Sequence, residues 1–118
     1  MALLNLRLMK KALSFGYLKK AKEERELRLQ EAGIEVASAS SVAETLALLR
    51  ESSYDVVIVG PTVPQDERDR VAAFAKQRKA RVIFLYRQFI QGAETGDALI
   101  SADGSAADLL EAVLALTA

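Results

Sequence analysis

Short apolar segments rich in β-branched residues alternate with longer charged segments along this chain of 118 residues. Runs at 12–17 (ALSFGY), 34–37, 56–60 (VVIVG) and 81–86 (RVIFLY) are predicted to be buried strands, with a short last strand at 98–101. The VVIVG run is apolar at nearly every position, which is typical of a central strand covered by helices on both faces. The alternation therefore predicts an α/β fold with a parallel sheet and right-handed crossovers.

Helix-forming residues fill the segments between these strands. The segment 18–32 is rich in helix formers and ends at Gly33, because glycine readily takes the left-handed conformation that closes a helix. Ser40 or Ser41 is expected to cap a second helix, with Glu44 placed to complete a capping box. That helix and the remaining ones are expected at 42–52, 66–79 and, capped by Ser105, 106–118.

Composition excludes several kinds of chemistry. The chain has no cysteine and no histidine, so it has neither thiol catalysis nor the commonest general base and metal ligand. No dinucleotide fingerprint, phosphate loop or nucleophile elbow is present. No apolar run approaches the ~20 residues of a membrane span. We expect no enzymatic activity, no cofactor, no metal and no membrane partner.

Charge is balanced overall but unevenly distributed. Residues 1–29 contain eight basic residues against three acidic ones, whereas no basic residue follows Arg87. This asymmetry indicates either two complementary surfaces of one fold or a basic face for an acidic partner. Acidic residues interrupt the basic segment and few aromatic residues accompany it, so nucleic acid is not an expected partner.

From about Lys10 to its end, the sequence resembles the receiver domains of response regulators, the CheY-like domains. The resemblance rests on the strand end Phe15-Gly16-Tyr17, the turn and strand beginning at Gly33, and the string SSVAETLALLRESSYDVVIVGPTVP, whose Pro64 matches the proline of the family. It implies a doubly wound, flavodoxin-like sheet of five parallel strands in the order 2-1-3-4-5. We expect residues 1–9 to be an N-terminal extension and 10–118 to be the domain.

Receiver domains transfer a phosphoryl group to an aspartate at the end of the third strand, beside magnesium held by acidic residues. Carried onto this sequence, the acidic pair falls on Gly16 and Tyr17, and the phospho-acceptor falls on Gly60. The hydroxyl residue of the fourth strand falls on Tyr86, and the lysine of the fifth falls on Ala102. The resemblance therefore implies a degenerate receiver, or pseudo-receiver, that lacks the phospho-acceptor and the metal ligands.

The segment between Tyr86 and Gly96 is also shorter than in the family. At 1.5 Å per residue, it cannot hold both a loop and a helix of three turns. We expect the fourth helix of the receiver fold to be shortened or missing.

The resemblance implies a cytoplasmic signal-transduction domain of the two-component type that acts by binding proteins, with a homodimer through the last strand and helix as one possibility. The alternative is a small-ligand or anion sensor at the carboxyl ends of the strands, where such sheets bind ligands. Lys19, Arg87 and Asp103 are the charged residues expected at that rim, whether for a ligand or for a partner.

Overall fold

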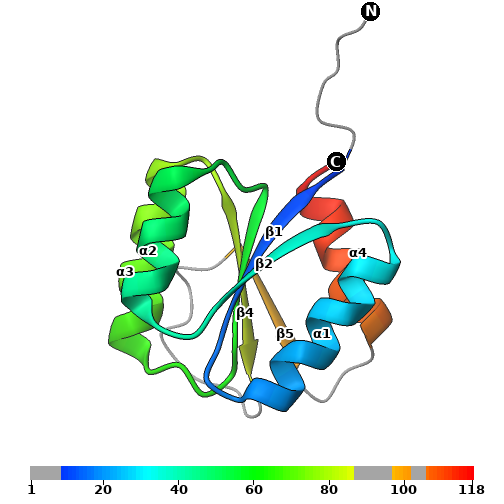
Figure 1. The fold of residues 1–118 in the computed structure, drawn as a ribbon, viewed down its shortest axis with the longest axis horizontal. Coiled ribbons are helices and arrows are strands. Elements are labelled where there is room, and N and C mark those ends of the chain that lie inside the picture. The colour runs from blue at the N-terminus through cyan, green and yellow to red at the C-terminus, as the bar shows by residue number, and fades with distance from the viewer. Residues whose placement is uncertain (1–8, 87–96, 102–105) are drawn as a thin grey trace, which may run out of the picture.

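The computed structural model describes residues 9–86, 97–101 and 106–118. Strands and helices alternate along the described chain (Figure 1). The elements are β1 (Lys11–Phe15), α1 (Lys19–Glu31), β2 (Glu35–Ala39), α2 (Val42–Glu51), β3 (Val56–Val59), α3 (Gln65–Gln77), β4 (Arg81–Tyr86), β5 (Ala98–Ser101) and α4 (Ala106–Leu116).

All strand pairs are parallel, and the sheet has the order β2-β1-β3-β4-β5. Crossing from β2 to β3 through α2 skips over β1, so the chain changes direction across the sheet at β1 and β3. This change of direction is the switch point at which doubly wound sheets bind ligands. The predicted α/β class, the parallel sheet and the order 2-1-3-4 are confirmed.

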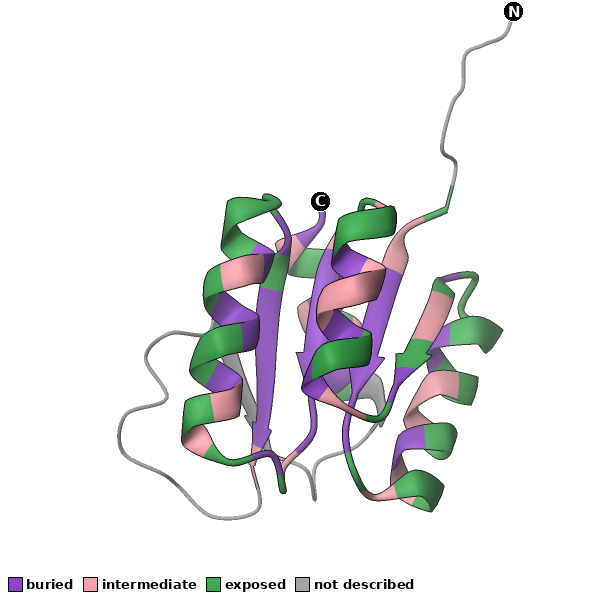
Figure 2. Cartoon of the chain, turned by 60° about the vertical axis from the view of Figure 1, so that its left-hand side comes forward, coloured by how far each residue is buried: buried purple, intermediate pink, exposed green. Residues whose placement is uncertain are grey.

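Helices cover both faces of the sheet. Figure 1 shows α2 and α3 on one face and α1 and α4 on the other. Successive residues of a strand point to opposite faces, so β3 places Val57 and Val59 in the core beneath α2 and α3, and Val56 and Ile58 in the core beneath α1 and α4. The strands β1, β3 and β4 are mostly buried, whereas the edge strand β2 and the outer helix faces are largely exposed (Figure 2).

Helix ends follow the local chemistry of their sequences. Ser41 caps α2 by accepting a hydrogen bond from the Glu44 backbone N–H at 3.0 Å, and the Glu44 carboxylate accepts from the Ser40 N–H at 2.7 Å. The predicted cap is confirmed, with Ser41 as the capping residue. Gly33 takes a φ of 87° just after α1, as expected for a helix stop. Lys79 takes a φ of 65° at the corresponding position after α3.

Several predicted boundaries shift by one or two residues. The first strand runs over Lys11–Phe15 and stops one residue before Gly16, where the 12–17 run is predicted to end; Tyr17 turns outward and is 44% exposed. The second strand runs over Glu35–Ala39 rather than 34–37, and α3 ends at Gln77 rather than at 79. The expected Ser105 cap, the shortened helix within 87–96 and most of the expected 1–9 extension lie outside the described residues.

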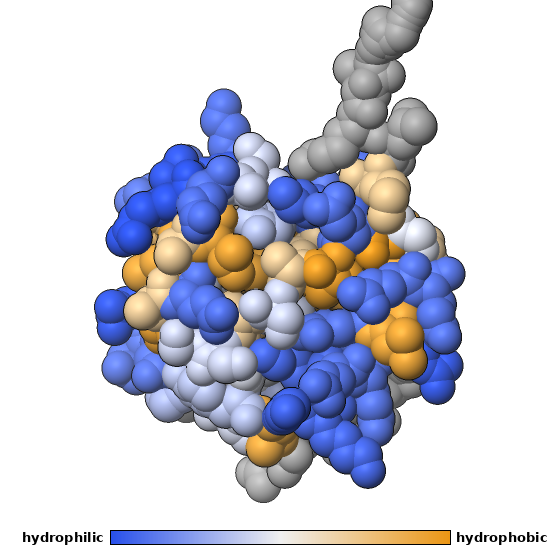
Figure 3. Space-filling view, viewed as in Figure 1, coloured by the Kyte–Doolittle hydropathy of each residue, from blue (hydrophilic) through white to orange (hydrophobic). Residues whose placement is uncertain are grey.

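The surface in the view of Figure 3 is largely hydrophilic, with apolar patches between charged regions. Among the described residues, no helix combines the length and the apolar character that crossing a membrane requires.

Candidate functional site

Two glycines meet at the carboxyl edge of the sheet. Gly16 follows β1 and Gly60 follows the neighbouring β3, and the Gly60 N–H donates to the Phe15 carbonyl at 2.7 Å. A Cβ atom added to Gly60 would lie 3.2 Å from the Gly16 Cα, which is backbone and cannot rotate away. A side chain at position 60 would therefore require the Gly16 backbone to shift by a few tenths of an ångström.

The Tyr17 side chain contacts both β1 and the start of α3. Its hydroxyl donates a hydrogen bond of 2.5 Å to the Glu67 carboxylate in the first turn of α3, and its ring packs edge-on against Phe15 at 5.4 Å. The hydrogen bond to Glu67, with a smaller effect of burial, raises the pKa of Tyr17 to about 12. The phenol therefore stays protonated at neutral pH and links the loop after β1 to α3.

Two basic side chains of α1 lie beneath the glycine pair. Lys22 is 4% exposed, and its Nζ donates to the Ala39 carbonyl at 2.9 Å and to Ser40 Oγ at 3.0 Å. Arg25 places Nη2 3.5 Å from the position that a Gly60 Cβ would occupy. Neither cation has a carboxylate within 4 Å among the described residues, and burial lowers the pKa of Arg25.

Lys22 and Arg25 are not among the predicted site residues, although their spacing in the sequence carries a signal. Leu18, Lys22, Arg25 and Leu29 are spaced by four, three and four residues, which is the spacing of one helix face. Leu29 is buried on this face, and so is Lys22. Because both cations lie among many other charges of α1, hydropathy alone gives α1 no clear inward side.

Arg68 supports the loop after β3 from below. It is 2% exposed, its Nε donates to the Val63 carbonyl at 2.8 Å, and its Nη2 donates to the Pro61 carbonyl at 3.2 Å. The guanidinium lies 5.6 Å from the Phe84 ring centroid, while its Nη1 is buried without a hydrogen-bond partner. Burial lowers the pKa of Arg68. Arg68 thus fixes the backbone that follows Gly60.

A pocket of about 380 Å³ opens beside β1 and β2 at the same edge. Its lining is polar and carries both signs of charge, so the pocket itself does not select an anion over a cation. The lining residues are Gly16, Tyr17, Lys19, Lys22, Glu23, Glu26, Ser38 and Ser40.

The structure brings most of the predicted rim residues to one edge. Gly16, Tyr17, Gly60 and Lys19 lie there together, and Lys19 is exposed at the first position of α1. Tyr86 is half-buried at the end of β4, the strand next to β3. Arg87, Ala102 and Asp103 lie outside the described residues. Within the part of the chain that is described, no group of three or more His, Cys, Asp or Glu residues could hold a metal ion.

Solved structures of response regulators share this architecture. The response regulator TrrA of Thermotoga maritima, in complex with magnesium and beryllium fluoride, aligns with a TM-score of 0.78 and 22% identity over 92% of this chain and 99% of that chain. The chemotaxis protein CheY4 of Vibrio cholerae gives a TM-score of 0.79 and 19% identity over 92% and 98% of the two chains. The receiver domain of the putative regulator NarL of Mycobacterium tuberculosis gives 0.78 and 18% over 92% and 96%.

No family model matches the sequence, and no curated protein matches it. At these identities the likeness is one of fold. The fold of this chain is that of the CheY-like receiver domains.

Proposed function

We propose that this chain is a receiver-like signal-transduction domain of the cytoplasm that acts by binding proteins and is not switched by phosphorylation. The observation that carries the proposal is the pair Gly16 and Gly60 with Arg25 beneath it. A phosphorylatable receiver keeps carboxylates at these strand ends, whereas here the nearest charged groups are cations.

The residues at this edge do not fit magnesium. A divalent cation prefers carboxylate oxygens, and Gly16, Tyr17 and Gly60 offer none. The Tyr17 hydroxyl is already engaged with Glu67, and Arg25 and Lys22 would repel a second cation. The mismatch supports a domain that works without this metal.

Phosphoryl transfer to position 60 also lacks a nucleophile. Gly60 has no side chain that could accept a phosphoryl group. We therefore propose a role in binding rather than in catalysis.

One experiment tests the proposal directly. Beryllofluoride with magnesium mimics the phosphorylated aspartate of a receiver, and acetyl phosphate is a phosphoryl donor. We expect the amide NMR signals of Gly16, Tyr17 and Gly60 to stay unchanged with either reagent. The Gly60→Asp variant should also remain unlabelled by acetyl phosphate, because its carboxylate would meet the Arg25 guanidinium instead of a metal. Site-specific shifts near residue 60, or a labelled variant, would reject the proposal.

Anion sensing at the same edge is a second candidate. The buried Lys22 and the half-buried Arg25, which lack carboxylate partners among the described residues, favour anion sensing over a purely structural role for these two side chains. Inorganic phosphate distinguishes the candidates in the same NMR measurement. Saturable shifts confined to Gly16, Tyr17 and the start of α1 would favour sensing, and unchanged signals would favour protein binding alone.

A further inference from the structure

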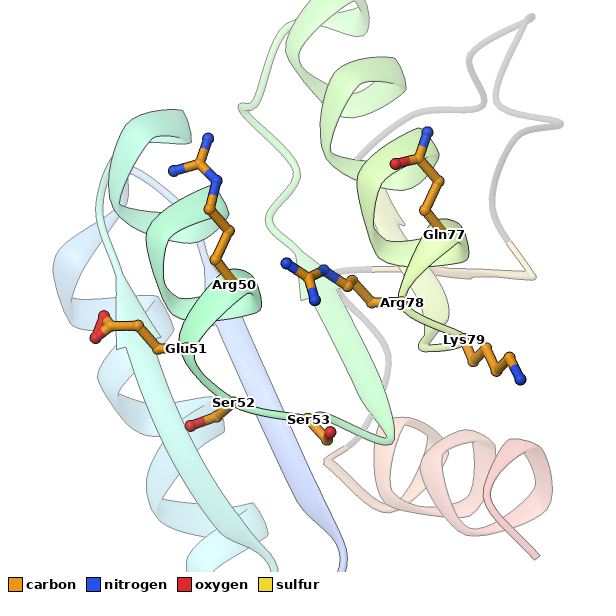
Figure 4. Close-up of a pocket in the computed structure, with 7 residues that line it drawn as sticks. All are labelled: Arg50, Glu51, Ser52, Ser53, Gln77, Arg78 and Lys79. Atoms are coloured by element: carbon orange, nitrogen blue, oxygen red, sulfur yellow. The ribbon is translucent and has the colours of Figure 1, made fainter.

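A second polar site lies at the opposite end of the molecule, between the ends of α2 and α3. A pocket of about 410 Å³ opens there, lined by Arg50, Glu51, Ser52, Ser53, Gln77, Arg78 and Lys79 (Figure 4). The surface over these helix ends is strongly hydrophilic in Figure 3.

The two arginines of this pocket both pack against one aromatic ring. The Phe74 ring lies 5.6 Å from the Arg50 guanidinium and 5.3 Å from that of Arg78, so both cations rest on the same partly buried side chain. In Figure 4, Arg78 extends from the end of α3 toward α2, and Arg50 lies on the facing side of α2. The ring thus holds two positive charges near one another.

No carboxylate neutralises this pair. Within the described residues, neither guanidinium has an ion pair or a hydrogen bond. The carboxylate of Glu51, which also lines the pocket, is turned away from both arginines (Figure 4). Cations at helix C-termini are favoured by the helix dipole, but such cations typically bond the last carbonyls, and these two do not. The two arginines therefore form a positively charged site without a carboxylate partner, which an incoming anion would stabilise.

From this geometry we infer that the pocket between α2 and α3 binds an acidic segment of a partner protein. The inference rests on the proposed protein-binding function and names the chemistry of the partner. Guanidinium groups match carboxylates in paired hydrogen bonds, and Ser52 and Ser53 add hydroxyls along the floor of the pocket. Only three cations line the pocket and Phe74 is partly buried beneath them, which leaves neither the phosphate contacts nor the stacking surface of a nucleic-acid site.

The test titrates the full chain with a capped hexaglutamate peptide and follows the amide NMR signals. We expect the largest shifts at 50–53 and 77–79, and no shifts with hexaglutamine. Arg50→Ala/Arg78→Ala should weaken binding roughly three- to tenfold, the range expected from losing two exposed charge contacts. The control Lys20→Ala/Arg28→Ala removes two exposed charges of α1 and should change affinity less than about twofold.

Three results would overturn the inference: no binding, equal weakening in both double variants, or the same shifts from inorganic phosphate at lower concentration. The last would assign the pocket to a small phosphate-bearing ligand. None of these results bears on the response to beryllofluoride, so this inference can fail while the proposed function stands. Equally, a response to beryllofluoride would reject the proposed function and leave binding of the acidic peptide at this pocket unaffected.

Discussion

At the scale of single residues, the carboxyl edge of the sheet contains buried basic side chains that lack carboxylate partners among the described residues. Lys22 is almost completely buried without a carboxylate within 4 Å among the described residues, and Arg68 carries a buried Nη1 that has no partner. Burying a cation costs free energy that hydrogen bonds to neutral groups only partly offset. Stability alone therefore does not explain why these positions are basic.

Replacing Lys22 by methionine tests this argument. Methionine keeps the length of the side chain without its charge, and the Ala39 carbonyl still accepts from the Gly16 N–H at 3.3 Å. We expect the free energy of unfolding, measured by urea denaturation, to be unchanged or to rise by up to about 2 kcal/mol. The exposed Lys20→Met control should stay within about 0.5 kcal/mol. A loss of more than about 1 kcal/mol in Lys22→Met would instead assign Lys22 to holding the fold together.

The Tyr17–Glu67 contact predicts a pH dependence. The hydroxyl must keep its proton to donate, and its pKa is raised from 10.0 to about 12. The contact is therefore fully present below pH 10 and is lost as the pH rises through about 12. In an ultraviolet titration, Glu67→Ala should move one of the three tyrosines back toward pH 10. Glu23 lines the same pocket but is not among the groups that raise the Tyr17 pKa, so Glu23→Gln should leave that transition in place. An unmoved transition in Glu67→Ala would remove Glu67 as the cause.

At the scale of elements, the helices α1 and α3 end in the same backbone conformation with different residues. Gly33 has a φ of 87° and Lys79 a φ of 65°. No atom lies within 4 Å of a Cβ built on Gly33, so the requirement for glycine there is conformational and not steric. Because glycine favours this conformation and lysine does not, the sequence predicts the end of α1 well and the end of α3 poorly. The predicted third helix therefore extends to residue 79.

Opposite substitutions should have opposite effects at these two positions. Gly33→Ala is expected to lower the free energy of unfolding by about 1 kcal/mol, because alanine is strained in the left-handed region. Lys79→Gly is expected to raise it by about 0.5–1 kcal/mol by relieving that strain. Lys76→Gly, inside α3, serves as the control and should cost about 1 kcal/mol. Thermal or urea unfolding measures all three, and a destabilised Lys79→Gly would contradict the strain argument.

At the scale of the whole molecule, a homodimer through β5 and α4, which the sequence raises as one possibility, would bury an exposed apolar side chain of α4. Leu114 on α4 is 50% exposed, and Leu27 on α1 is 53% exposed, which makes the two a matched pair. If the dimer forms through α4, Leu114→Glu should give the monomer mass in light scattering, and Leu27→Glu should keep the dimer. A monomeric parent chain, or a dimer lost equally in both variants, would argue against this interface.

The sequence predicts the residues that meet at one end of the molecule better than those that meet at the other. The glycines and Tyr17 at the carboxyl edge follow apolar runs directly, so their convergence follows from the parallel sheet itself. The residues Arg50, Phe74 and Arg78 come from different helices, and nothing in either segment marks them as neighbours. Their meeting depends on how α2 and α3 pack side by side.

The alternation of apolar runs and helix formers by itself determined the α/β class, and glycine and serine chemistry determined the stop of α1 and the cap of α2. These signals are local, because propensities and caps act within one or two turns of the backbone. Tertiary structure alone decided that Lys22 and Arg25 lie beneath the glycine pair and that two arginines share one phenylalanine ring. Such contacts join residues whose spacing is set by crossovers and helix packing, which no short window of sequence contains.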